Sequence, residues 1–271
     1  MRRLLTTLIA LALGAATSHA GTSAPGVSLN WDRCFGDGSV QYKDFACDVN
    51  TGSDRMVGTF ELSSDNPGVT GLEIVLDFKS ATGVPTWWTT NAPGGTSGCR
   101  GLALTAQLVP PAGAVACSDW AGGQGAGGIA AFRVDNSYSP VHGRLILGSA
   151  VPSPVDLVAH QEYFAFTVVV SHAKTVGTGS CAGCLEPMVF FLSSVNVVNG
   201  NTGSTLLNRG ANYLGSQWIS WQRGYASNIG FFCSHNPFGE CLGPYVEWTT
   251  VPYSVTPTRN STWGQVKSLY R

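Results

Sequence analysis

Alternating apolar and polar residues mark the clearest element in the chain, between Gly71 and Phe78. Its apolar positions are Leu72, Ile74, Leu76 and Phe78. The intervening positions are Glu73, Val75 and Asp77. Alternation with a period of two predicts a strand with one buried face and one face in water. We therefore expect Glu73 and Asp77 to lie on the wet side of a sheet.

Further runs of strand length follow at intervals typical of an all-β fold. They cover residues 55–62, 102–108, 129–134, 143–151, 162–171 and 187–198. No stretch between them shows a helical period over three turns, which argues against a parallel α/β sheet. The pattern predicts an antiparallel, jelly-roll-like β-sandwich.

The last third of the chain changes texture near Asn199 to Thr205, where Gly, Asn, Ser and Thr dominate. Short apolar runs then recur at residues 217–222, 231–233 and 245–248. We interpret residues 201–271 as additional strands on the same sandwich, with a small subdomain as the alternative. A short C-terminal helix is expected from Ser261, with Trp263, Val266 and Tyr270 on one face.

The N-terminus has the layout of a secretory signal peptide over residues 1–20: Arg2 and Arg3, an apolar run, and a small-residue end at Ala20. A membrane anchor would need about 20 apolar residues, and this run is shorter. Residues 21–28 are expected to form a mobile leader. Residues 21–54 then form a disulfide-stitched N-terminal segment, and residues 55–200 the sandwich.

Eight cysteines form an even set: Cys34, Cys47, Cys99, Cys117, Cys181, Cys184, Cys233 and Cys241. In an exported chain such a set predicts four disulfides. Because the cysteines fall in four local couples, nearest-neighbour pairing is the simplest expectation. It joins Cys34 to Cys47, Cys99 to Cys117, Cys181 to Cys184 and Cys233 to Cys241.

Charge narrows the classes of function. Only 11% of residues are charged, and loss of Arg2 and Arg3 leaves 13 basic against 16 acidic residues, a net charge of −3. A chain without a basic stripe gives no case for nucleic-acid binding. The surface must instead be covered by uncharged polar residues and glycine.

The order of strands from Val57 to Val198 resembles the cohesin-like and carbohydrate-binding-module-like bacterial sandwiches. Three pieces carry the resemblance: the strand at Gly71–Phe78, the bend at Trp87 and Trp88, and a late trio of strands at residues 144–148, 162–168 and 191–197. The ending Thr262–Arg271 resembles the tails of uncharacterised exported bacterial proteins. The resemblance implies a non-catalytic extracellular module.

Cys181-Ala-Gly-Cys184 has the spacing of a redox motif or of half a zinc site. A redox thiol usually lies at a helix N-terminus, whereas this loop lies between strands. For zinc, the remaining ligands would come from Cys233, His235 or Cys241. In an oxidising compartment a disulfide is the favoured interpretation.

Tryptophans supply the candidate ligand site. Trp87, Trp88 and Trp120 are the residues we expect to stack against sugar rings, with Trp87 and Trp88 preferred because they lie on a loop-like bend. Trp218 and Trp221 are three residues apart, so on a strand they face opposite ways and at most one is free for a ligand.

The evidence for an enzyme is weaker than that for a binding or structural module. Glu73, Asp77, Glu162 and Glu186 are scattered carboxylates, without a recognisable acid and base pair. No Gly-x-Ser-x-Gly elbow is present, and the glycines of residues 122–128 lead into a strand and not into a phosphate-binding helix. The histidines at 142, 160, 172 and 235 are expected at the surface.

Calcium remains an open option. Asp32, Asp37, Asp44, Asp48 and Asp54 crowd the first loops, without the spacing of a calcium-binding loop. No other cofactor is indicated.

The sequence therefore predicts a secreted, extracellular or cell-surface module that acts through surface contacts or self-assembly with other protein subunits. A carbohydrate-binding module that contacts cell-surface glycans is the first alternative. A secreted hydrolase is the second.

Overall fold

The computed structural model describes residues 25–80, 82–91, 98–135, 142–200, 203–207, 217–222, 230–235 and 241–247, the last two ranges by their backbone only. Its secondary structure is almost entirely β, with two 3₁₀ turns, η1 (Phe35–Asp37) and η2 (Thr86–Trp88). The expected signal peptide and C-terminal helix lie outside the described residues. The predicted all-β class is confirmed.

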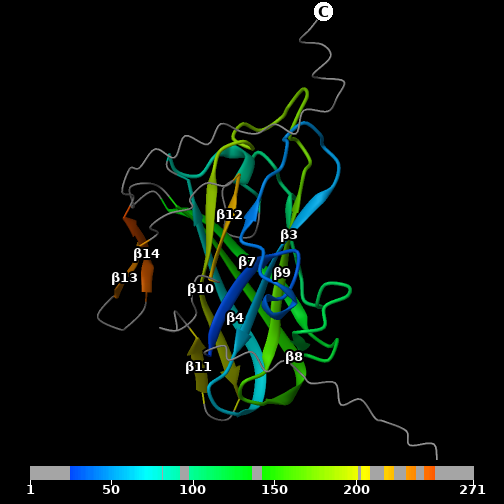
Figure 1. Cartoon of the computed structure of the whole chain (residues 1–271), viewed down its shortest axis with the longest axis vertical. Coiled ribbons are helices and arrows are strands. Elements are labelled where there is room, and N and C mark those ends of the chain that lie inside the picture. Colours follow the sequence, from blue (N-terminus) through cyan, green and yellow to red (C-terminus); the bar gives the residue numbers. More distant parts are fainter. Residues whose placement is uncertain are drawn as a thin grey trace, which may run out of the picture.

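Two large sheets make up the fold, and Figure 1 shows their long strands running side by side along the longest axis. The five-stranded sheet has the order β1-β3-β9-β5, with β6 parallel to β9. Its strands are β1 (Gly26–Trp31), β3 (Ser53–Glu61), β5 (Leu104–Gln107), β6 (Ser118–Asp119) and β9 (Glu162–Ser171). β1 begins inside the stretch expected to be a mobile leader, so that expectation is wrong from Gly26 onward.

The seven-stranded sheet has the order β2-β12-β10-β4-β8-β7, with β11 also paired to β10. Its strands are β2 (Tyr42–Lys43), β4 (Asn66–Lys79), β7 (Ala126–Asp135), β8 (His142–Leu157), β10 (Met188–Asn199), β11 (Gly203–Leu207) and β12 (Trp218–Trp221). A separate hairpin joins β13 (Gly230–His235) to β14 (Cys241–Glu247). Beyond residue 201, strands β11 and β12 therefore extend the seven-stranded sheet, whereas β13 and β14 pair only with each other among the described strands.

The core lies between the two sheets, where the apolar sides of their strands meet. In β4 the predicted inward set, Leu72, Ile74, Leu76 and Phe78, is buried throughout. Trp31 of β1 meets Phe190 of β10 with ring centroids 6.1 Å apart, which joins one sheet to the other. Burial of these large side chains is the main source of stability for such a fold.

A third layer covers the outer side of the five-stranded sheet. Val57 of β3 and Phe164 of β9 point outward, yet both are buried beneath the Cys34–Cys117 disulfide. The Glu162 carboxylate accepts hydrogen bonds from the backbone N–H groups of Phe35 and Gly36, at 2.8 and 2.9 Å. The segment around η1 is thus tied to the start of β9.

Three disulfides are formed among the described residues: Cys34–Cys117, Cys47–Cys184 and Cys99–Cys181. The nearest-neighbour pairing expected for these six cysteines is wrong. Strand pairing explains the difference, because it brings together cysteines that lie 82 to 137 residues apart in the sequence. Cys99, for example, precedes β5, whose Leu104 pairs with Val170 at the end of β9, just before the Cys181 loop. Side chains of Cys233 and Cys241 lie outside the described part.

Candidate functional site

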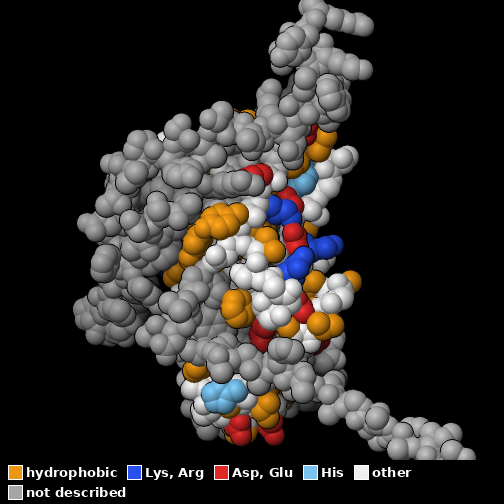
Figure 2. Space-filling model, in the orientation of Figure 1, with side chains coloured by type: hydrophobic (Ala, Val, Ile, Leu, Met, Phe, Trp, Pro, Cys, Tyr) orange, Lys and Arg blue, Asp and Glu red, His pale blue; other side chains and the backbone are white. Residues whose placement is uncertain are grey.

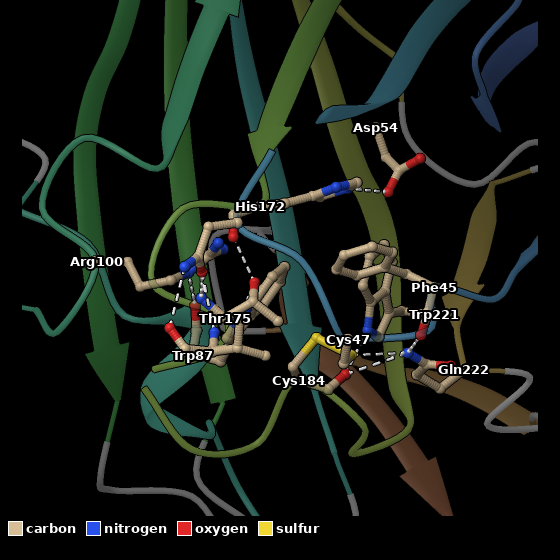
Figure 3. Close-up of a disulfide and its surroundings, with 12 residues drawn as sticks. Phe45, Cys47, Asp54, Trp87, Arg100, His172, Thr175, Cys184, Trp221 and Gln222 are labelled. Carbon is tan, nitrogen blue, oxygen red and sulfur yellow. Dashed lines mark hydrogen bonds and ion pairs between the residues drawn. A yellow bond between two sulfur atoms is a disulfide. The ribbon is translucent and has the colours of Figure 1, made fainter. Parts of the chain in front are cut away.

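One end of the sandwich gathers aromatic, charged and cysteine side chains around the loop between β9 and β10 (Figure 3). Two disulfides leave this loop from positions three residues apart: Cys181 pairs with Cys99, and Cys184 with Cys47. The carbonyl of Ala182, between them, accepts hydrogen bonds from the Trp87 N–H at 2.8 Å and from Thr86 Oγ1 at 3.0 Å. The loop is thus pinned to η2 as well as to the two disulfide partners.

Four tryptophans pack beside this loop, in one cluster formed by Trp31, Trp87, Trp88 and Trp221. Trp87 and Trp221 are stacked at 5.4 Å, and Trp87 and Trp88 meet edge to face at 4.8 Å. Trp87 is 0% exposed and Trp88 is 1% exposed. The ring faces of Trp87 and Trp88 are therefore covered by neighbouring side chains.

The expectation that Trp87, Trp88 and Trp120 stack against sugars is not supported by their positions. Trp120 is only 4% exposed, and so all three lack a free ring face. The bend at residues 84–88 is a 3₁₀ turn folded into the core, where aromatic area contributes most. Trp87 Nε1 also donates a hydrogen bond to Thr175 Oγ1 at 3.1 Å, which satisfies its polar atom inside the protein.

Trp218 and Trp221 face opposite ways, as the odd spacing predicts. Trp221 is buried, and its Nε1 donates to the Cys184 carbonyl at 2.7 Å. Trp218 is half-buried on the outer side of the seven-stranded sheet, where its ring meets that of Tyr42 at 5.6 Å and 79°. Tyr42 is 41% exposed. No sequence pattern singles out Tyr42, because only the β2–β12 pairing places it beside Trp218.

Arg100 is a buried cation at the centre of this end. Its Nε donates to the Trp87 carbonyl, and its Nη1 donates to the carbonyls of Ser171 and Ala173. The guanidinium lies over the Trp87 ring, 3.3 Å from the centroid, a cation–π arrangement. Burial lowers the pKa of Arg100 to about 9. The side chain ties the η2 turn to the segment after β9 and is too deep to meet a ligand from solvent.

His172, expected at the surface, is buried at the end of β9 (Figure 3). Its Nε2 lies 2.7 Å from Asp54 Oδ2, and its Nδ1 lies 3.0 Å from the Thr51 carbonyl. The Phe45 ring is stacked on the imidazole at 3.7 Å. Each ring nitrogen therefore faces an oxygen atom of the protein. His142 is also buried, whereas His160 is exposed as expected; the side chain of His235 is not described.

No sequence signal could have paired His172 with Asp54, which is 118 residues away. The register of β3 and β9 pairs Ser53 with Ser171. The residues that follow them, Asp54 and His172, therefore lie close enough to bond. The sequence predicts that both strands exist. It does not predict which strand ends lie together.

Lys43 continues the network outward. Its Nζ lies 2.7 Å from Asp54 Oδ1 and is also bonded to Asp32 Oδ2. Desolvation lowers the pKa of Lys43, but the hydrogen bonds with Asp32 and Asp54 outweigh it, so the net shift is upward. The ammonium also lies 5.8 Å from the centre of the Trp31 ring. Lys43 thus occupies the space between two of the aspartates considered for calcium.

The other candidate carboxylates are also engaged within the fold. Asp37 accepts hydrogen bonds from the Val115 and Ala116 N–H groups, and Glu186 from the hydroxyls of Ser80 and Thr82. Across the described ranges, no three His, Cys, Asp or Glu side chains come close enough together to hold a metal ion. The candidate carboxylates named here therefore lie at separate places in the described part of the fold.

Neither a family model nor a curated protein matches this chain. Within the described ranges, no helix is long and apolar enough to cross a membrane. The end of the sandwich around the loop between β9 and β10 thus combines packed indoles, two disulfides and buried charged groups that are bonded to backbone carbonyls or to each other.

Proposed function

We propose that the protein is an exported, non-catalytic structural or adhesion module of the extracellular space or cell surface, and that it works through contacts of its outer surface. One observation carries the proposal. The aromatic and titratable side chains around the loop between β9 and β10 are buried and engaged inside the protein: Trp87 and Trp88 pack against each other, Arg100 donates to backbone carbonyls, and His172 lies 2.7 Å from Asp54. Groups held in this way stabilise a fold and are not presented to a substrate.

Export is supported by the expected signal peptide and by the disulfides. Disulfides persist in oxidising compartments and are rare in the cytosol. Three of them link segments 82 to 137 residues apart. Long closed loops restrict the unfolded chain strongly, which suits a protein that has to persist outside the cell.

Surface contact is supported by aliphatic side chains left in water. Leu102 is 87% exposed and Val115 is 88% exposed. Leu102 lies beside the Ser171 end of β9, because the carbonyl of its neighbour Ala103 accepts a hydrogen bond from the Ser171 N–H. Val115 lies toward the other end of β9, near η1 and β6. Apolar contacts at opposite ends of a molecule suit head-to-tail association. On the face seen in Figure 2, apolar side chains form several separate groups among polar ones.

Light scattering of the mature, oxidised protein over a range of concentrations tests the proposal. We expect the average mass to rise with concentration for the wild type and to stay at the monomer value for the double variant Leu102→Ser, Val115→Ser. Val158→Ser, another exposed aliphatic position, is the matched control and should behave as the wild type. A wild type that stays monomeric at every concentration would count against self-association.

A glycan-binding module is the second candidate, favoured by the Tyr42–Trp218 pair. The two rings meet edge to face on the outer side of the sheet, and Tyr42 is exposed. The face of a single ring in such a pair offers an apolar surface with a polar atom at its edge. A glycan array should then give signals that Trp218→Ala abolishes. Leu206→Ser, at an exposed aliphatic position on β11, is the control and should retain them. An array that stays silent with the wild type removes this candidate.

A further inference from the structure

Cys181 and Cys184 are the two points at which separate disulfides enter a single four-residue segment. Their partners differ in exposure from them: Cys181 and Cys184 are buried, whereas Cys99 and Cys47 are half-buried. A reductant in solution therefore meets Cys99 and Cys47 first. The two buried cysteines lie three positions apart in the sequence, in the same loop.

We propose that this loop is a thiol–disulfide exchange site for dithiol reductants, which converts the two long-range disulfides into one local Cys181–Cys184 disulfide. A dithiol thiolate attacks Sγ of Cys99 and expels Cys181 as a thiolate. That thiolate attacks Sγ of Cys184 and expels Cys47, which takes a proton from water. The second thiol of the reductant then resolves the mixed disulfide and releases Cys99. One dithiol is oxidised by two electrons, and the protein gains two thiols.

Several contacts favour each step. The exposed Lys174 ammonium donates to the Cys99 carbonyl at 2.8 Å, so the residue whose sulfur is attacked carries a bound cation at its backbone. At the other end, Gln222 Nε2 lies 3.3 Å from Cys47 Sγ and can donate to the thiolate that leaves. Thiol–disulfide exchange is faster when the leaving thiolate is stabilised.

The backbone holds the reacting groups in place. Ala182, between the two cysteines, is bonded to Trp87 and Thr86, and the Cys181 N–H donates to the Lys174 carbonyl at 2.9 Å. These bonds hold the backbone of residues 181–184 in place while the disulfides exchange. Cys47 has a φ of +56°, in the left-handed region that residues other than glycine seldom occupy. Its release from the disulfide frees that residue to relax.

The consequence is a two-electron release of two segments. Formation of the local disulfide detaches the segment around Cys47 and the segment around Cys99 together. The Cys34–Cys117 disulfide has no second disulfide leaving from a neighbouring residue. It provides an internal control, because it can only be reduced directly.

The test is a titration of the native oxidised protein with dithiothreitol, followed by acid quench, alkylation and peptide mapping. We expect a species in which Cys47 and Cys99 are alkylated together and Cys181 is linked to Cys184, formed while Cys34–Cys117 is intact. Peptides in which Cys47 and Cys184 are both alkylated while Cys99–Cys181 persists, or the reverse, would show independent reduction and overturn the proposal.

Two variants sharpen the result. In Cys99→Ser, Cys181→Ser the relay cannot operate, so Cys47 can be released only by direct attack on its own sulfur and should be alkylated several-fold more slowly than in the wild type; an unchanged rate contradicts the route. Gln222→Asn keeps an amide and tolerates the left-handed backbone, with φ at +57°, but is one methylene shorter. It should slow the appearance of free Cys47 several-fold without changing the rate at Cys34–Cys117.

Discussion

At the scale of single residues, the ion pair between Asp77 and Arg144 shows how a charge is held on the outer side of the seven-stranded sheet. Asp77 was expected in water, since it alternates with the buried residues of β4, yet it is only 2% exposed. Both Asp77 oxygens accept from Arg144, at 2.7 and 3.0 Å, and Ser193 Oγ donates at 2.5 Å. Alternation identifies the face of a residue, but not whether that face is covered.

Asp77→Ala should lower the free energy of unfolding by about 3 kcal/mol, because it removes the buried carboxylate that accepts hydrogen bonds from Arg144 and Ser193. Breaking a buried pair costs roughly 3 to 5 kcal/mol, and we expect the lower end since the Arg144 side chain is 30% exposed. Urea denaturation measures the change. Glu73→Ala, on the same face of the same strand but exposed, should change stability by less than about 0.5 kcal/mol. Equal effects of the two substitutions would contradict this account.

Lys79, at the end of the same strand, gives a pH dependence. Burial lowers its pKa to about 8 in the folded protein, from an ordinary value of 10.5. Between these two pH values the unfolded chain binds more protons, so this group makes stability rise with pH across that interval. Lys79→Met should flatten the rise and increase the free energy of unfolding at pH 7. Chemical denaturation at a series of pH values measures both effects, and an unchanged slope would argue against them.

At the scale of elements, two glycines of β8 test how closely this strand packs against its neighbour β4 in the seven-stranded sheet. A Cβ on Gly143 would lie 2.4 Å from the Phe78 ring, whereas a Cβ on Gly148 would have no neighbour closer than the Leu72 carbonyl oxygen at 4.0 Å. Gly143→Ala should therefore cost about 1 to 3 kcal/mol through overpacking, measured by thermal or urea unfolding. Gly148→Ala is the control and should be close to neutral. Similar losses for both would indicate that the Phe78 contact is not the cause.

The sequence predicted the positions of the long strands better than any other feature of the structure. The predicted strand at residues 162–171 is β9, the one at 71–78 lies in β4 with its expected inward residues buried, and the one at 187–198 matches β10 to within one residue at each end. These runs are long and strongly patterned. The run at residues 102–108 is shorter than predicted, because β5 covers only Leu104–Gln107 and leaves Leu102 in solvent.

The candidate site was harder to predict than the strands. The sequence predicts a loop-like bend at Trp87 and Trp88, because nothing in a run of five residues shows that a 3₁₀ turn folds inward. His172, Asp54, Lys43 and Arg100 come from four separate segments, and only the pairing of β3 with β9 and of β2 with β12 brings them to one end. Such contacts depend on topology, which local patterns do not encode.

At the scale of the whole molecule, the disulfides follow the topology. Cys34 and Cys117 meet at the start of β9, since η1 is tied to Glu162 and β6 pairs with Tyr163 and Phe164. Cys47 follows β2, which reaches Cys184 through the β12 and β10 pairing. Each disulfide therefore joins segments that the sheets have already brought together, and each closes a long loop of the unfolded chain.

Peptide mapping of the mature protein under non-reducing conditions tests this account most directly, because the connectivity depends on the register of both sheets. The account predicts peptides that join Cys34 to Cys117, Cys47 to Cys184 and Cys99 to Cys181. Peptides that join Cys34 to Cys47, or Cys99 to Cys117, would contradict it.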